Sequence, residues 1–421
     1  MRNINPLIEI TKKHALLYAF FLVLYEFLTY ISNDMIMPGM HQVTEQFKAS
    51  SDQIPKAVTA FMLGGASLQF FLGPLSDAFG RKKVMLIGVF IFFLSTFLLS
   101  ISHNMHAFLL ERFFQGMGVC FIGAIGYTTL QEMFDDIDAV RLTALMSSFS
   151  IMAPLMGPLL GSYIVMHGDW RMIFTLVAAL TAFAWWGLST YMPETIGAKK
   201  RNGDVIEKQL LSIAMALNNY RQLIQNKSFM CSLIMYSMMS IPCMIWIALS
   251  PVMIIADAHK SLYEYSLWQI PMFSSFLFAN TLLQRLTARF KLQQLMEQGI
   301  YIIIVNLSLC LVCQNLISNG YLSFVPLFVG YFFGYAIASA PMYRLMFGLS
   351  PVSKGTTGAM ISLSIMLIQS IGIELGNVVY HHYHYQGLSV FLSAIGLGIA
   401  TLAFFVIRFK KQAMALEAAT N

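Results

Sequence analysis

Charge is scarce in this sequence. Only 11% of its 421 residues are Asp, Glu, Lys or Arg, whereas a soluble domain carries roughly 25%. Hydrophobic residues make up 57% of the chain, and the mean hydropathy is +0.67. This composition excludes an ordinary soluble globular domain and predicts a polytopic membrane protein.

Motifs of enzymes and of nucleotide-driven pumps are also missing. The sequence has no Gly-Lys dipeptide, and therefore no Walker A loop, and it has no H-E-x-x-H or G-x-S-x-G motif. No large extramembrane domain fits between the apolar segments. A membrane-embedded enzyme, a signalling receptor and an ATP-driven pump are therefore disfavoured, no cofactor is expected, and an ion gradient remains as the source of energy.

Metal-binding and redox patterns are weak. The single C-x-x-C has neither a second pair nor a nearby His, which favours reduced packing residues over a metal or redox site. The cluster "HHYHY", at 381–385, is interpreted as a solvated turn in preference to a metal or pH-sensing site. The five cysteines all lie in apolar segments: Cys120, Cys231, Cys243, Cys310 and Cys313.

Continuous apolar runs dominate what is present. A helix needs about 20 apolar residues to cross a membrane, whereas a β-barrel would show alternating segments of about ten. The runs predict an all-α fold with twelve spans, at 14–37, 54–75, 84–102, 105–131, 142–166, 170–192, 228–256, 266–287, 295–316, 321–348, 356–379 and 388–407.

The longest polar interval divides these spans into halves. We expect a six-helix bundle at 1–192, a cytoplasmic linker at 193–227 with an interfacial helix, and a second six-helix bundle at 228–421. Such a duplicated bundle places the substrate path between the halves. Of the 26 Lys and Arg residues, 20 fall on one side of the membrane, which predicts that both termini are cytoplasmic. The net charge of +6 then follows from topology and gives no reason to expect nucleic acid as a partner.

Ionisable residues inside the spans are the candidate functional residues, because each costs roughly 2.5 to 3.5 kcal/mol to insert. Glu26 falls near the middle of the first span, and Asp34 lies eight residues further on, about 12 Å along a helix. Both can line one broad side of it. We expect at least one of them to handle protons or cations; the alternative is that each is merely paired in a packed interface. The candidates in or next to the spans are Glu26, Asp34, Arg112, Glu132, Arg344 and Glu374.

Arginine in a span must find carboxylate, carbonyl or water partners. Arg112, in "LLERFFQGMG", is interpreted as an interior post that joins helices by hydrogen bonds, a role compatible with biasing the protonation of the first-span acids. Arg344, in "APMYRLMFG", is either an anchor or a snorkelling side chain.

Two further motifs stand out. "GPLSDAFGRKKV" places Asp77 and Arg81 at a tight cytoplasmic turn, where they suggest a breakable charge clamp or a simple basic turn. "APLMGPLLGS" places Gly157, Pro158 and Gly161 in the fifth span, where small residues permit close helix approach and proline bends the helix.

These stretches resemble a known family. "GPLSDAFGRKKV" is similar to the loop signature of the major facilitator superfamily, and "RFFQGMG" is similar to its span-four arginine motif. "APLMGPLLGS" resembles the span-five motif of its drug/proton antiporters. The stretches "LYEFLTYISNDMIMPGM", "CFIGAIGYTTLQEMF", "TALMSS", "YEYSLWQIPMF" and "GIELG" extend the likeness to the multidrug members through both halves.

The resemblance implies a proton-coupled exporter of lipophilic cationic and neutral drugs, working by alternating access in the bacterial inner membrane and needing no partner chain. A transporter of one specific metabolite and a monovalent cation/proton antiporter remain alternatives. Its implied roles are as follows: proton coupling by Glu26, Asp34 and Arg112; drug binding by Tyr30, Asn33, Asp34, Tyr127, Met146 and Ser150; a cytoplasmic latch of Asp77 and Arg81; and a flexing motif of Gly157, Pro158 and Gly161. Two departures are Ala78, where a basic residue is usual, and Ser150, where these antiporters carry a small apolar residue.

Overall fold

Helices account for the whole architecture that the structure describes. A computed structural model describes residues 6–134, 136–199, 205–206, 213–286, 289–317, 320–352 and 354–420, and within these ranges it contains helices and no β-strand. The chain divides into two compact units, Met1–Asn218 and Asn219–Asn421. Their boundary falls inside the predicted linker, whose residues 200–204 and 207–212 lie outside the described ranges. The predicted domain limits stay a prediction.

Helices lie at all twelve predicted spans. By length and apolar composition, 8 helical segments of the described chain can cross a membrane, or up to 9 if one bent pair is a single span. One of the 8, Thr356–Val406, has 51 residues and covers two predicted spans; the backbone leaves helical geometry inside it, at His384. The predicted spans 142–166 and 266–287 are helical but are not among the 8.

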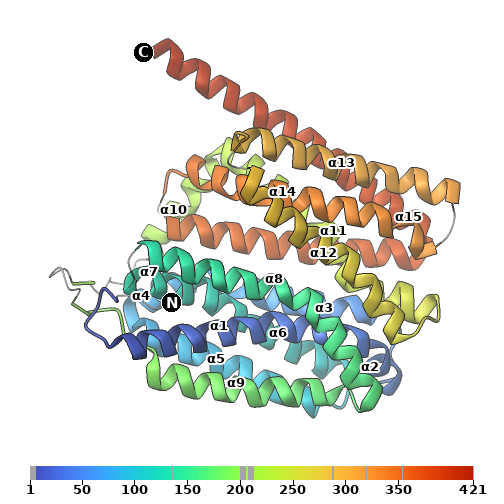
Figure 1. The fold of residues 1–421 in the computed structure, drawn as a ribbon, viewed down its shortest axis with the longest axis horizontal. Helices are drawn as coiled ribbons and strands as arrows, with labels where there is room; N and C mark the ends of the chain where they lie inside the picture. Colours follow the sequence, from blue (N-terminus) through green and yellow to red (C-terminus); the bar gives the residue numbers. More distant parts are fainter. Residues whose placement is uncertain are drawn as a thin grey trace. The chain divides into compact units, whose positions relative to one another are not determined.

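The first unit begins with the helix that carries the candidate acids. Its elements are α1 (Lys12–Met35), η1 (Met37–Gly39), α2 (Met40–Gln46), α3 (Gln53–Ser67), α4 (Gln69–Phe79), α5 (Arg81–Ser100), α6 (Met105–Phe121), the π-helix η2 (Ile122–Gly126), α7 (Tyr127–Met133), α8 (Asp136–His167) and α9 (Arg171–Tyr191). Helix α1 packs against both α8 and α9, and α3 packs against α6 (Figure 1).

Local sequence explains where several of these helices begin and how closely they pack. Side-chain oxygens of Thr11 and Asn104 accept backbone N–H groups at the starts of α1 and α6, as good N-caps do. Helices α3 and α6 meet at glycines: a Cβ on Gly64 or Gly116 would lie 1.9 Å from a carbonyl oxygen of the other helix. Small residues let two membrane helices approach at the backbone, and this contact fixes the helix that carries Arg112.

The second unit contains α11 (Lys227–Pro251), the π-helix η3 (Val252–Asp257), α12 (Leu262–Leu286), α13 (Leu292–Ile317), η4 (Gly320–Ser323), α14 (Val325–Leu349) and α15 (Lys354–Thr420). Helix α11 packs against α15, and α13 against α14, where Gly299 meets the backbone of Ala338. The unit boundary falls within α10 (Ile213–Gln225), whose Leu223 packs in a buried cluster with Phe229 and Leu233.

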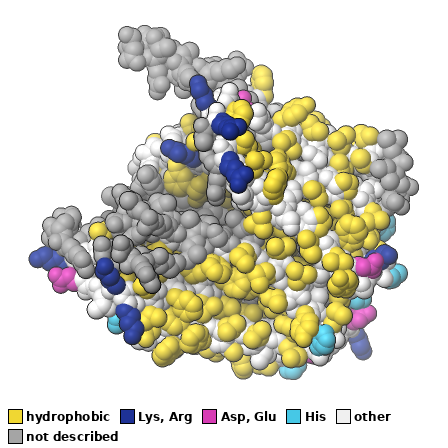
Figure 2. Space-filling model, viewed as in Figure 1, with side chains coloured by type: hydrophobic (Ala, Val, Ile, Leu, Met, Phe, Trp, Pro, Cys, Tyr) yellow, Lys and Arg dark blue, Asp and Glu magenta, His cyan; other side chains and the backbone are white. Residues whose placement is uncertain are grey.

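The surface of the first unit carries the signature of a lipid-facing protein. Along α9, large apolar side chains are exposed, among them Phe183 and Trp186. Figure 2 shows apolar side chains spread over the part of the surface formed by α5 and α9, with the charged residues gathered near the ends of these helices. Exposed apolar surface of this extent needs hydrocarbon around it, in agreement with the predicted spans.

Candidate functional site

Glu26 lies inside the first unit, fully buried in α1. Its side chain is 1% exposed, and Oε1 accepts hydrogen bonds from Tyr127 Oη at 2.8 Å and from Ser150 Oγ at 2.9 Å. The other carboxyl oxygen, Oε2, is buried and has no hydrogen-bond partner among the described residues. A buried polar atom without a partner is uncommon and often marks a functional site.

Helices remote in sequence bring the two hydroxyl donors to this carboxyl group. Tyr127 is the first residue of α7 and directly follows the π-helix η2, whose sequence "IGAIG" separates α6 from α7. Short π-helical segments of this kind often occur at functional sites. Ser150 lies on α8, which packs along α1. The structure therefore brings together three predicted site residues from three helices.

Asp34 belongs to a second buried network, at the C-terminal end of α1. It is 5% exposed, and its Oδ1 accepts a hydrogen bond from Asn33 Nδ2 at 3.1 Å. The side-chain oxygen of Asn33 in turn accepts a hydrogen bond from the Nη2 of Arg112. One neutral amide therefore bridges the guanidinium and the carboxyl group.

Arg112 is fully buried, and the acceptors of its hydrogen bonds are neutral amide and carbonyl oxygens. It donates to Gln115 Oε1 and to the carbonyl oxygen of Ala57 at 3.4 Å, and its guanidinium carbon lies 4.7 Å from the centre of the Phe61 ring. No ion pair within 4.0 Å links it to a carboxylate of the described residues. The interpretation of Arg112 as an interior hydrogen-bond post fits these contacts.

The glycine motif of α8 lies against the Asp34 end of α1. A Cβ on Gly157 would stand 2.6 Å from the Cβ of Asp34, and one on Gly161 would stand 1.9 Å from the carbonyl oxygen of Met35. Pro158, between them, is buried. The two glycines therefore set how closely α8 approaches Asp34.

The positions of the other two predicted drug-binding residues, Tyr30 and Met146, give no direct sign of a binding role. Tyr30 is half-buried in α1, and Met146 is 0% exposed in a core cluster that also contains Leu22 and Ile125. Besides Glu26, the hydroxyl group of Ser150 has a second hydrogen-bond acceptor, the carbonyl oxygen of Met146 at 3.2 Å. Whether Tyr30 and Met146 bind a substrate stays a prediction.

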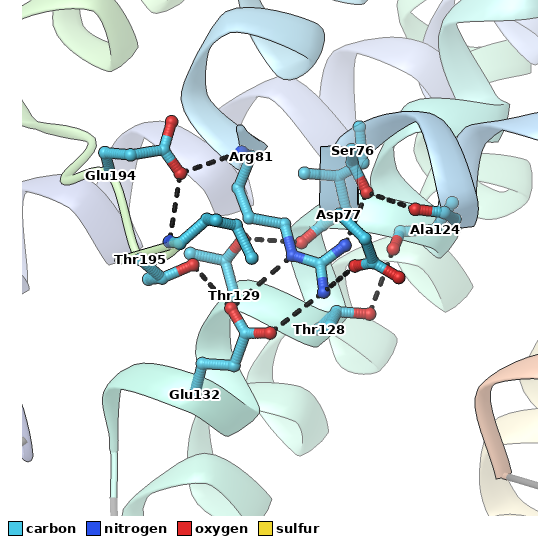
Figure 3. A network of polar contacts seen from close by, with 12 residues as sticks. Ser76, Asp77, Arg81, Ala124, Thr128, Thr129, Glu132, Glu194 and Thr195 are labelled. Carbon is cyan, nitrogen blue, oxygen red and sulfur yellow. Dashed lines mark hydrogen bonds and ion pairs between the residues drawn. The ribbon is translucent and has the colours of Figure 1, made fainter. Parts of the chain in front are cut away.

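Arg81 and Asp77, the pair predicted to form a latch, are in contact, and they belong to a larger polar cluster around Arg81. Arg81 Nη2 lies 2.6 Å from Asp77 Oδ1 and 2.9 Å from Glu132 Oε1, and Nη1 donates to Ser76 Oγ (Figure 3). The residue before it, Gly80, has φ +102°, a conformation that favours glycine and permits the sharp turn between α4 and α5. Three helices, α4, α5 and α7, meet at this side chain.

Two residues just after α9, Glu194 and Thr195, also belong to this cluster. Glu194 accepts backbone N–H groups from Arg81 at 2.8 Å and from Lys82 at 3.2 Å, and so caps the start of α5. Thr195 donates to Glu132 Oε2 at 2.5 Å (Figure 3). Glu132 was visible in the sequence as an ionisable residue of unknown role. Glu194 and Thr195 were missed, because nothing in "MPETIG" indicates that this segment folds back on α5.

The remaining candidates stay apart from these networks. Arg344 is exposed on α14, and Glu374 is half-buried on α15. Residues 381–384 are exposed, whereas Tyr380 is buried and donates to Asp257 Oδ2 at 2.6 Å. The described residues hold no cluster of three or more His, Cys, Asp or Glu able to bind a metal.

Two helical units that both contain apolar helices long enough to cross a membrane, the first of which buries two carboxyl groups and an arginine, define a multi-pass helical membrane transporter. The sequence model of the Major Facilitator Superfamily matches residues 22–376, so the chain belongs to this family. The buried networks of Glu26 and Asp34 and the latch of Arg81 all lie within that match.

Relatives and solved structures agree with this assignment. The chain is 37% identical over 405 residues to the multidrug transporter MdfA of Yersinia pestis, covering 96% of this chain and 97% of the relative. It is 38% identical over 406 residues to MdfA of Escherichia coli O157:H7, covering 96% of both. A D-xylose–proton symporter of known structure matches with a TM-score of 0.74 at 14% identity, over 93% of this chain and 97% of the symporter, which supports the fold alone.

Proposed function

We propose that this protein is a proton-coupled multidrug efflux antiporter that exports lipophilic cationic and neutral compounds by alternating access. The observation that carries the proposal is the buried, half-satisfied carboxyl group of Glu26, next to a second buried acid eight residues along the same helix. A buried charge without a fixed partner must be neutralised by a proton or by a cation. Relatives that carry the name multidrug transporter, at 37–38% identity over nearly the whole chain, support the same activity.

Each predicted residue then has a role in this exchange of protons for drug. Glu26 and Asp34 exchange a proton for the drug, and Arg112 acts on Asp34 through the amide of Asn33. Tyr127 and Ser150 orient the Glu26 carboxyl group, while Tyr30 and Met146 contribute to drug binding. Arg81 with Asp77 and Glu132 forms the latch, and the α8 glycine motif permits α8 to move along α1.

The proposal includes the setting in which the protein works. It lies in the bacterial inner membrane with both termini cytoplasmic, acts as a monomer, has no enzymatic activity and binds no nucleic acid. Proton movement supplies the energy, because an entering charge carries about 2.3 kcal/mol per 100 mV of membrane potential.

Transport by the wild-type protein tests the proposal. In inverted vesicles with a respiration-driven pH gradient, adding a lipophilic cation or a neutral compound such as chloramphenicol should release protons from the lumen. If the protein is correctly inserted and no drug of a varied panel causes proton release, the proposal is contradicted. A response to Na⁺ or K⁺ alone would instead support a monovalent cation/proton antiporter.

A further inference from the structure

The Glu26 carboxyl group is bonded unequally at its two oxygens. Oε1 accepts both O–H groups within reach, those of Tyr127 and Ser150, while Oε2 is buried and has no hydrogen-bond partner among the described residues. One oxygen is therefore held by the protein and the other is left for a ligand or a proton.

The two hydroxyl groups favour the charged form of this carboxyl group. Hydrogen bonds to an ionised acceptor are roughly twice as strong as those between neutral groups, so a donor to Oε1 stabilises the carboxylate more than the acid. Ser150 has a second acceptor, the carbonyl oxygen of Met146 at 3.2 Å, but the contact with Glu26 is shorter, at 2.9 Å.

The described part of the chain supplies no positive charge close to this carboxyl group. Within the described residues, no Lys, Arg or His forms an ion pair with Glu26 within 4.0 Å. A carboxylate buried in this way is expensive until a positive charge joins it. A cationic ligand lying against Oε2 would supply that charge even without an N–H or O–H group of its own, whereas a neutral ligand would not.

We propose that Ser150 is a specificity-determining residue: its hydroxyl group, with that of Tyr127, stabilises the carboxylate form of Glu26 relative to the acid and so shifts the site's preference toward lipophilic cations. This inference rests on the proposed drug-transport function and specifies how its substrate class is selected. Ser150 acts through Glu26 and need not touch the ligand.

Removing the hydroxyl should weaken cation binding selectively. In the purified full-length protein, we compare calorimetric Kd values for tetraphenylphosphonium, which carries a buried positive charge and no hydrogen-bond donor, and for neutral chloramphenicol. One hydrogen bond to a charged group corresponds to about a tenfold change in an equilibrium constant. For Ser150→Ala, the ratio of the cation Kd to the chloramphenicol Kd should rise about tenfold.

The pH profile gives a second readout that a merely structural role would not move. Cation binding needs the ionised carboxyl group, and losing a donor makes ionisation less favourable. The pH of half-maximal tetraphenylphosphonium binding should therefore move upward in Ser150→Ala, by about one unit for a tenfold effect. Tyr127→Phe should move it in the same direction, and Ser150→Thr, which keeps a hydroxyl group, should restore the wild-type profile.

A matched control is Ser237→Ala. Ser237 is a fully buried serine of α11 whose hydroxyl donates to the carbonyl oxygen of Leu233 in its own helix, so its loss should leave the Kd ratio and the pH profile unchanged. An unchanged ratio and profile in Ser150→Ala would overturn the inference. So would equal weakening of both ligands without a pH shift. If Ser150→Ala does not fold, Ser150→Cys, which is similar in size but only a weak hydrogen-bond donor, decides by the same criteria.

The outcomes separate this inference from the proposed function. A wild-type protein that neither binds nor transports any drug contradicts the proposed function itself. A wild-type protein that binds tetraphenylphosphonium in a pH-dependent manner, with Ser150→Ala indistinguishable from it, contradicts only the role of Ser150.

Discussion

Arg112 donates a hydrogen bond to the side-chain oxygen of Asn33, and the side-chain nitrogen of Asn33 donates one to Asp34 Oδ1. The guanidinium therefore influences the acid without forming a direct ion pair with it. Arg112 also donates to Gln115 Oε1 and to the carbonyl oxygen of Ala57, so Asn33 is one of several acceptors that hold it. Asn33 thus links two buried groups, Arg112 and Asp34.

Asn33→Leu should destabilise the protein and impair export of cations. The substitution removes an acceptor from the fully buried Arg112, and an unsatisfied buried donor costs about 1–3 kcal/mol, more for a charged one. We expect a lower Tm in detergent and slower cation export. Asn306→Leu is the control, because that half-buried amide donates its hydrogen bond to the carbonyl oxygen of Ile302 in its own helix. A Tm no lower than that of the control would contradict the bridging role of Asn33.

Gly157→Ala should disturb Asp34 directly. The added methyl group would stand 2.6 Å from the Cβ of Asp34, so α8 must move away from α1. We expect lower transport of cationic and neutral drugs at normal expression, measured by growth on drug and by uptake into vesicles. Gly348→Ala, where nothing lies within 4 Å of the new Cβ, should transport like wild type. Equal transport by the two variants would show that close approach of α8 is not needed.

Glu194→Ala should weaken the start of α5. Its carboxylate accepts two backbone N–H groups of that helix, and loss of such a cap costs about 0.5–2 kcal/mol. We expect a lower Tm by thermal denaturation, with little change for Glu45→Ala, an exposed acid that pairs, among the described residues, with His41 of its own helix α2. Similar stabilities for both variants would argue against the cap.

Glu132→Ala should lower stability more than Asp77→Ala. Glu132 contacts Arg81 at 2.9 Å and also accepts a hydrogen bond from Thr195, so it joins α7, α5 and the segment after α9, whereas Asp77 joins only the adjacent helix α4 to Arg81. Thermal denaturation of the two variants side by side measures the difference. The opposite order would show that the sequence motif alone, with Asp77 as partner, carries the latch.

Hydrophobic runs made the spans predictable, because hydrocarbon demands about 20 apolar residues for each crossing. Glu26, Asp34 and Arg112 were identifiable for the same reason, since charge inside such a run is rare. The break within α15 was predicted as a gap between two spans, but its position at His384 was not, because one non-helical residue leaves no mark on hydropathy.

The contacts between distant residues could not be predicted from the residues themselves. Tyr127 lies 101 residues from Glu26, and Glu194 lies 113 residues from Arg81. Periodicity describes one helix at a time and does not say which helices meet. Resemblance to a family supplied Tyr127 and Ser150 as site residues, yet their shared acceptor, one oxygen of Glu26, becomes visible only in the structure.

The central claim is that the buried acids of α1 exchange protons for cationic drugs. The most direct measurement is proton release from inverted vesicles, upon addition of tetraphenylphosphonium, by wild type and by the double variant Glu26→Gln/Asp34→Asn. We predict release by wild type and none by correctly inserted double variant. Cation export by the double variant at the wild-type rate and with normal proton coupling would contradict the account.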